Sequence, residues 1–140
     1  MKKRVYIAGP LFSQAELDFN ENVEKSLNDL GYETFLPQRD GHTLSDLISR
    51  GEPEDDAIKK IFELDVREIQ KSDILLLILD GRVPDEGACV ELGIAYANKK
   101  ECIGLKTDSR CLMENLDNPL ILGALDGKIA RSIDDLRNFL

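Results

Sequence analysis

Residues 73–79 read DILLLIL, in which six consecutive apolar residues follow a single aspartate. A continuous apolar run of this length is typical of a central strand in a parallel sheet, because helices cover both faces of such a strand. The run is far shorter than the roughly 18 apolar residues that a membrane-spanning helix needs, and no other stretch of the chain approaches that length. We therefore expect a protein built around a parallel sheet, without a membrane partner.

The rest of the chain alternates between short apolar runs and stretches of helical periodicity. Ser13 is followed by Glu16 in the spacing of a capping box, which predicts the start of a helix that ends before Gly31. Four further strands are predicted at residues 5–8, 32–36, 102–105 and 128–130. Further helices are predicted at residues 57–70 and 86–99, in part of 112–125 where Pro119 interrupts, and after a cap at Ser132.

Strands that alternate with helices imply right-handed βαβ crossovers and a parallel sheet. The predicted fold class is α/β, a flavodoxin-like (Rossmann-like) three-layer sandwich with a five-stranded, mainly parallel sheet. A length of 140 residues suits a single domain over residues 1–140. Residues 37–56 are polar and rich in turn-forming residues, so they predict a long loop with at most one short helical turn, of the kind that often forms a functional lid.

The composition excludes several functions. A net charge of −9 argues against a protein that reads a nucleic-acid backbone. His42 is the only histidine, which nearly excludes histidine metal sites and Ser-His triads. Three cysteines without a CxxC pair are expected to be buried thiols. The N-terminal apolar run is too short for a signal peptide, so we expect a cytoplasmic location.

In a parallel α/β sheet, ligands bind beyond the carboxyl ends of the strands, where the strand order reverses. This rule selects residues 9–13, including Gly9 and Pro10, and residues 80–91. Asp65 lies on the preceding helix, and four acids fall within the second segment. They are Asp80, Asp85, Glu86 and Glu91.

Glu91 stands out among these acids because its surroundings, ACVELGIAYA, are apolar. Burying a carboxylate is costly unless it is paired or used, and such groups are common at active sites. Periodicity alone leaves open that Glu91 faces solvent. Two carboxylates at a sugar site suggest glycosidic chemistry. Tyr6, near the end of the first strand, could hold a carboxylate in place or could be an ordinary strand aromatic.

Gly87 and Gly93 flank the acids in DEGACVELG. Gly87 could permit close approach of a ligand at the start of a helix, where an anion can also bind. The chain contains neither a Walker A loop nor a GxGxxG motif. Nucleoside triphosphates and dinucleotides are therefore poor candidates for its ligand.

Three segments together resemble the nucleoside 2-deoxyribosyltransferase family: VYIAGPLF, LDVREIQKSD and PDEGACVELGIAYA. The most specific piece is Asp-x-Gly-x-x-x-Glu-x-Gly, which begins at Asp85. The resemblance covers roughly residues 5–133. It implies double displacement at C1′ of a 2′-deoxynucleoside, through a covalent deoxyribosyl-enzyme and with retention at C1′, and no metal or organic cofactor is needed.

The resemblance also implies a role for individual residues. Glu91 matches the nucleophile, Tyr6 the tyrosine that orients it, and Asp85 the acid that assists departure of the base. Asp65 matches an aspartate near the sugar. Asn118 resembles an asparagine that a neighbouring subunit lends to the sugar 5′-hydroxyl, which implies a homo-oligomer with shared active sites. Phe12 is expected to line the base pocket, and Asp80 is a second candidate for substrate binding.

The expected partners are therefore small-molecule nucleosides and nucleobases. A related branch hydrolyses nucleoside 5′-monophosphates and often uses serine and arginine after the first strand to bind phosphate. Here that loop reads GPLFSQAE, with Ser13 but no arginine, although Arg39 and Arg82 stand in other loops. Free nucleosides are thus preferred, with monophosphate hydrolysis as one alternative. A nucleoside or nucleotide sensor without catalysis is the other alternative, since a fold does not fix a function.

Overall fold

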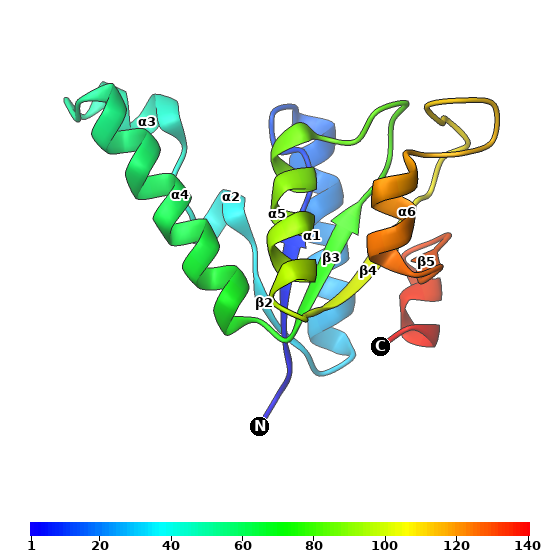
Figure 1. Cartoon of the computed structure of the whole chain (residues 1–140). Helices are drawn as coiled ribbons and strands as arrows, with labels where there is room; N and C mark the ends of the chain where they lie inside the picture. The colour runs from blue at the N-terminus through cyan, green and yellow to red at the C-terminus, as the bar shows by residue number, and fades with distance from the viewer.

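The computed structural model describes residues 1–140 and contains one five-stranded sheet (Figure 1). The strand order is β2-β1-β3-β4-β5, and every pair of neighbours is parallel. This confirms the predicted α/β fold with the flavodoxin-like strand order. The strands are β1 (Arg4–Ala8), β2 (Glu33–Phe35), β3 (Ile74–Ile78), β4 (Glu101–Leu105) and β5 (Ile129–Ala130).

The apolar run that begins at Ile74 forms the central strand β3, as predicted. Its residues alternate between two apolar cores, one on each face of the sheet, because successive side chains of a strand point to opposite sides. Ile74, Leu76 and Ile78 face the core that includes residues of α1 (Gln14–Asp29). Leu75, Leu77 and Leu79 face the opposite core, beneath the three remaining longer helices. These are α4 (Glu54–Lys71), α5 (Glu86–Ala97) and α6 (Pro119–Leu125).

The segment 37–56 differs from the predicted long loop. It contains two short helices, α2 (Pro37–Asp40) and α3 (Leu44–Ser49), and α4 already begins at Glu54. Pro37 stands at the first turn of α2, where its missing N–H costs nothing. The Thr43 side chain caps α3 by accepting the Asp46 amide, and Leu47 is buried. With only one buried residue in α3, the sequence offered too short a periodicity to predict that helix.

The C-terminal third departs from the prediction in two places. Pro119 begins α6 rather than interrupting a longer helix, and Asn118 caps it by accepting the Leu120 amide at 2.9 Å. The last element is the 3₁₀ helix η1 (Asp134–Asn138) rather than an α-helix. Ser132 nevertheless accepts the amide of Asp135 at 3.0 Å, so the local contact expected of a cap is present.

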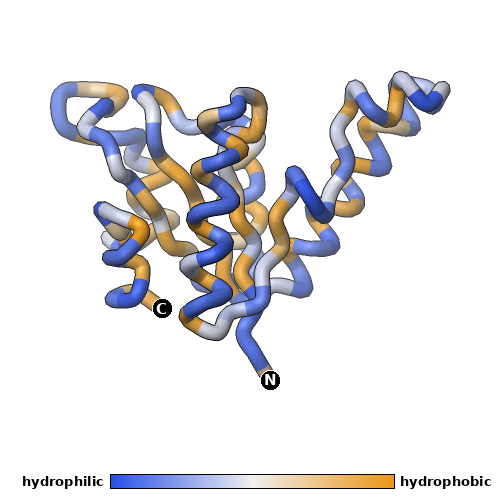
Figure 2. Tube along the Cα trace, turned by 180° about the vertical axis from the view of Figure 1, so that it is seen from behind, coloured by the Kyte–Doolittle hydropathy of each residue, from blue (hydrophilic) through white to orange (hydrophobic).

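Two views show what surrounds the sheet. In Figure 2 apolar residues concentrate along the strands, whereas the outer helices alternate between polar and apolar residues. Figure 1 shows α3 and the N-terminal half of α4 as an arm that leans away from α5. No helix has both the length and the apolar character needed to cross a membrane.

Candidate active site

The strand order reverses between β1 and β3, so a ligand site is expected above their carboxyl ends. Three predicted residues converge beside this point from three elements: Tyr6 from β1, Asp65 from α4 and Glu91 from α5. The Tyr6 ring belongs to the core beneath α4 and α5, where it stacks on Phe35 with ring centroids 5.1 Å apart. The sheet thus fixes the tyrosine, and the two helices bring the acids to it.

The hydroxyl of Tyr6 is the most unusual polar group of this cluster. It is fully buried and has no hydrogen bond of ordinary geometry. Burial, together with the negative charges of Glu91 and Asp65, raises the pKa of Tyr6 far above its ordinary value. The hydroxyl therefore keeps its proton at every physiological pH, and the two carboxylates are the acceptors within its reach.

Among the acids of the site, Glu91 has the pKa that is raised furthest above its ordinary value. Burial raises the pKa of its carboxyl group to about 8, the Tyr6 hydroxyl opposes the rise, and the charges of Asp65 and Asp85 add to it. The residue as a whole is only partly buried, so some of its surface is open to solvent. A carboxyl group of this kind is poised to change its ionisation near neutral pH.

Asp65 shares the environment of Glu91. Burial raises the pKa of Asp65 to about 6, while the Tyr6 hydroxyl and nearby His42 lower it. His42 belongs to the segment between α2 and α3, so a residue of the predicted lid is near enough to influence Asp65 through its charge. The sequence did not predict a role for His42, because only the fold brings it near Asp65.

Asp85 stands at the start of α5, where its Oδ2 accepts the Ala88 amide at 2.9 Å. It is partly exposed and is close enough to Glu91 to raise the pKa of that residue. A Cβ at Gly87 would lie 3.2 Å from the same Oδ2. A side chain at this position would therefore crowd the Asp85 carboxylate, which glycine avoids.

The loop after β1 lies close to the end of β3. A Cβ at Gly9 would lie 3.0 Å from Ile78, so glycine permits the close approach of this loop to the end of β3. The carbonyl of Pro10 accepts the buried Asn20 side chain at 2.9 Å, which fixes the turn. The Phe12 side chain is 80% exposed, and therefore available to a ligand.

Asp80 is used differently from the other acids. Its Oδ1 accepts the Thr107 amide and its Oδ2 the Thr107 hydroxyl, both at 2.6 Å. The Asp108 amide lies 3.3 Å from Oδ1. The carboxylate thus joins the loop after β3 to the loop after β4, and both of its oxygens are engaged within the protein.

Asn118 is not brought to Glu91 within the chain. It lines an apolar groove of about 780 Å³ between α5 and α6. On α5 the groove is lined by the stripe Cys89, Leu92, Gly93 and Tyr96. Glu91 interacts instead with Asp65 of α4. The predicted site residue Asn118 therefore lies across α5 from the acidic cluster.

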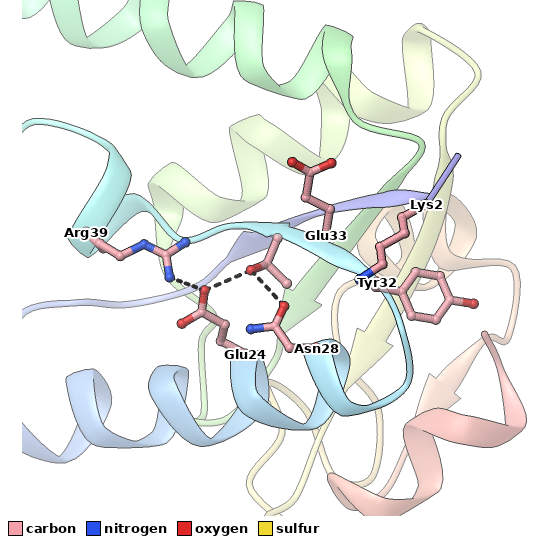
Figure 3. A pocket seen from close by; sticks show the side chains of 7 residues that line it. Lys2, Glu24, Asn28, Tyr32, Glu33 and Arg39 are labelled. Atoms are coloured by element: carbon pink, nitrogen blue, oxygen red, sulfur yellow. Dashed lines mark hydrogen bonds and ion pairs between the residues drawn. The ribbon is translucent and has the colours of Figure 1, made fainter.

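Other hollows lie away from these residues. Figure 3 shows a polar pocket between α1 and β2, where Arg39 contacts Glu24 and Thr34 donates to Glu24 at 2.8 Å. Arg39 also pairs with Asp40 at 2.7 Å, so its charge is used locally. No group of three His, Cys, Asp or Glu side chains has an arrangement that could hold a metal ion.

The raised pKa of Glu91 predicts a pH-dependent change in stability. The folded state holds the proton up to about pH 8, whereas the unfolded chain ionises near pH 4.5. The free energy of unfolding therefore falls as pH rises from 4.5 to 8, and it stays low above pH 8. Glu91→Gln removes this cost, so we expect it to gain about 2 kcal/mol, or roughly 6 °C in Tm, at pH 8.5 and almost nothing at pH 4.5.

Thermal melts of both proteins at the two pH values test this expectation. Glu21→Gln is the matched control, because Glu21 is exposed on α1 and should leave Tm unchanged at both pH values. An equal Tm of wild type and Glu91→Gln at pH 8.5 contradicts the expectation. Such a result means that Glu91 has no raised pKa in the folded protein.

The strand order reverses beside a cluster of acids of raised pKa, which is the arrangement of an α/β protein with a ligand site at that point. The chain belongs to the nucleoside 2-deoxyribosyltransferase family, whose family model matches residues 5–124. This confirms the resemblance that the sequence motifs indicated. None of the curated proteins compared with the chain matches it.

Solved structures agree with this assignment in fold. A conserved protein from Enterococcus faecalis V583 has a TM-score of 0.82 and 26% identity, over 99% of this chain and 97% of that one. The 2-deoxyribosyltransferase from Bacillus psychrosaccharolyticus has a TM-score of 0.75 and 23% identity, over 98% and 92%. A CMP N-glycosidase from Clostridium botulinum has a TM-score of 0.61 and 18% identity, over 97% and 96%.

Proposed function

We propose that the protein cleaves the N-glycosidic bond of 2′-deoxynucleosides through a covalent deoxyribosyl-Glu91 and transfers the deoxyribose to another nucleobase. The observation that carries the proposal is the buried Tyr6 hydroxyl beside two acids of raised pKa, Glu91 and Asp65. A tyrosine that keeps its proton can hold a carboxylate in one orientation without neutralising it. An oriented, poorly solvated carboxylate is what attack at a sugar carbon requires.

In the proposed reaction, the ionised Glu91 attacks C1′ and the bond from C1′ to the base nitrogen breaks. Asp85 contacts the departing base and relays a proton to it from solvent, and its partly exposed position at the start of α5 suits contact with a base edge. The second base then attacks C1′ through a ring nitrogen, the bond from C1′ to the Glu91 oxygen breaks, and the proton of that nitrogen leaves through Asp85 to solvent. Two inversions give net retention, and the missing 2′-hydroxyl favours the oxocarbenium-like transition state.

The loop after β1 favours free nucleosides over 5′-monophosphates. The amides of Phe12 and Ser13 both donate to Oε1 of Glu16, at 3.1 and 2.8 Å. A helix start of this kind can bind phosphate only if its amides are free. Here the carboxylate of Glu16 occupies the two amides that precede α1, so a phosphate bound by them would have to displace a negative charge.

Asn118 can serve the proposed site only from a neighbouring subunit, because it lies across α5 from Glu91. Its groove has an exposed apolar border, in which Leu120 is 85% exposed. Ile58 and Phe62 are also exposed, on the face of α4 that carries Asp65. A second copy that seats its groove against this face would bury both surfaces and bring its Asn118 toward the acids. The proposed enzyme is therefore a homo-oligomer with shared sites.

Leu120→Asp tests the assembly, because it places a charge in the apolar contact. We expect the oligomer to dissociate and kcat/KM to fall about 10-fold or more, as loss of a buried apolar contact implies. Sedimentation velocity measures the first effect and a base-exchange assay the second. Leu30→Asp, at the end of α1, is the control and should change neither. A fully active wild-type monomer would refute the shared site.

Incubation with a deoxynucleoside, with and without a second free base, tests the function itself. A new nucleoside supports transfer, whereas release of base alone with or without acceptor identifies a hydrolase. The same assay with deoxynucleoside 5′-monophosphates decides between the two substrate classes. Binding without turnover of any of these compounds would favour a sensor and contradict the proposal.

A further inference from the structure

Lys106 is a buried cation that the proposed chemistry does not use. It follows β4 directly, its side chain is 2% exposed, and its amide donates to the Ala130 carbonyl at 2.9 Å. An ammonium group is seldom buried unless it is paired. Its place at the carboxyl end of the sheet puts it on the side where ligands bind in this strand order.

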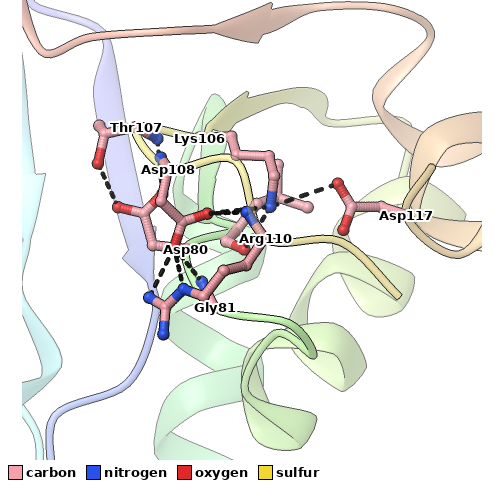
Figure 4. A network of polar contacts seen from close by, with 8 residues as sticks. Asp80, Gly81, Lys106, Thr107, Asp108, Arg110 and Asp117 are labelled. Atoms are coloured by element: carbon pink, nitrogen blue, oxygen red, sulfur yellow. Dashed lines mark hydrogen bonds and ion pairs between the residues drawn. The ribbon is translucent and has the colours of Figure 1, made fainter. Parts of the chain in front are cut away.

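The Nζ of Lys106 is surrounded by three oxygen atoms (Figure 4). The carbonyl of Leu79 and Oδ1 of Asp108 each lie 3.4 Å away, and Oδ2 of Asp117 lies 3.6 Å away. These oxygens come from the end of β3 and from both ends of the segment between β4 and α6. One side chain therefore connects three pieces of chain.

The two carboxylates around Lys106 connect it to different parts of the protein. Asp108 connects it to the loop after β3, and Asp117 connects it to Asn118. Oδ2 of Asp108 accepts the Gly81 amide at 2.8 Å, and Asp80 holds Thr107 in return. Through these bonds the start of the segment after β4 is fixed to the loop after β3, which leads to Asp85.

Asp117 connects the same network to Asn118. It is 6% exposed, its Oδ1 is buried without a hydrogen bond, and Lys106 is the cation that pairs with it. The next residue, Asn118, directly precedes α6 and uses its own Oδ1 to cap the helix. The amide nitrogen of Asn118 is left free for another partner, and its position depends on how Asp117 is held.

We propose that Lys106 is a positioning residue that fixes Asn118 by holding Asp117, and that it thereby sets how strongly the enzyme prefers a substrate with a 5′-hydroxyl. The inference rests on the proposed function and on the expectation that Asn118, lent by a neighbouring subunit, contacts that hydroxyl. A buried ion pair adds little stability compared with apolar packing of the same volume. What a methionine of similar length cannot supply is the restraint on the carboxylate of Asp117.

The test compares a 2′-deoxynucleoside with the matching 2′,5′-dideoxynucleoside, which lacks the 5′-hydroxyl. One hydrogen bond to that group should give wild type about a 10-fold preference in kcat/KM, mainly through KM. Lys106→Met and Asn118→Ala are each expected to bring this ratio close to one, with little change for the dideoxynucleoside. Lys106→Met/Asn118→Ala should show no further change, because both substitutions act on the same contact with the 5′-hydroxyl.

Lys106→Met leaves Asp117 buried without its cation, so the variant could unfold. Lys106→Met/Asp117→Asn removes both charges and is the variant on which the test relies if the single one does not fold. It should fold and still lack the 5′-hydroxyl preference. Lys128→Met is the matched control, because Lys128 pairs with Glu101 at the opposite end of β4 and is half exposed. Its ratio should equal that of wild type.

Amide hydrogen exchange gives a readout that needs no turnover. In Lys106→Met/Asp117→Asn, residues 107–122 should exchange about 10-fold faster, while α1 stays unchanged. Unchanged exchange in this segment, or an unchanged substrate ratio in a folded variant, overturns the inference. Equal losses on both substrates also overturn it, since they indicate a merely structural role. Absence of glycosidic turnover in wild type refutes the proposed function instead, and exchange then decides the role of Lys106.

Discussion

Glu91→Ala is expected to lower kcat/KM for deoxynucleoside cleavage by about 10⁴-fold, because it removes the proposed nucleophile. Without that carboxylate the reaction cannot proceed by two displacements. Only binding and the remaining acids, Asp65 and Asp85, can then assist departure of the base. The loss should appear in kcat rather than KM, since Glu91 is proposed to act on the reacting carbon.

Two measurements separate this expectation from a simple loss of folding. Circular dichroism and Tm should show a folded variant, because the fold gains nothing from a buried acid of raised pKa. Mass spectrometry of wild type mixed with substrate, without acceptor base, should find deoxyribose attached to a peptide that contains Glu91. The same peptide should be unmodified in the variant.

Glu21→Ala is the control for this experiment, because it removes an exposed glutamate from α1 and should keep full activity. Undiminished turnover in Glu91→Ala would refute the nucleophile. Loss of turnover in Glu91→Ala together with a sugar adduct on another acid would move the role to that residue. In either case the family assignment would stand and the mechanism would change.

Tyr6→Phe is expected to reduce kcat by about 100-fold while leaving Tm unchanged or slightly higher. The ring keeps its stacking on Phe35, so packing is preserved. The hydroxyl that is lost has no hydrogen bond of ordinary geometry in the free protein, and its removal therefore costs the fold little. Activity suffers because Glu91 loses the group that orients it.

The pH profile gives Tyr6→Phe a signature of its own. Attack requires ionised Glu91, so kcat/KM of wild type should rise with pH up to about 8, the pKa of Glu91. The Tyr6 hydroxyl lowers the pKa of Glu91, and its loss must raise that pKa further. The rising limb should therefore move to higher pH in the variant.

Tyr32→Phe is the matched control, because Tyr32 packs on the core at the opposite face of the sheet. It should preserve both the rate and the pH profile. A pH profile of Tyr6→Phe that coincides with that of wild type would show that Tyr6 does not interact with Glu91. A limb that moves to lower pH would contradict the direction of the effect.

The sequence predicted the fold because its signals are local. The unbroken apolar run from Ile74 predicted a central strand, and the capping box at Ser13 predicted the start of α1. The short helices α2 and α3 were missed because α3 contributes only one buried residue and α2 none. Pro119 was read as an interruption, although a proline at the first turn of a helix is equally well tolerated.

The motif around Asp85 and Glu91 determined the family and the identity of the proposed nucleophile, since spacing along one helix can be read from sequence. Only the tertiary structure decided how deeply Tyr6, Glu91 and Asp65 are buried and how they influence one another, because they come from three elements and their pKa values depend on burial and on each other. The ion pair of buried Lys106 with Asp117 has the same origin. Its members become neighbours only when the sheet is complete, and no local pattern encodes that contact.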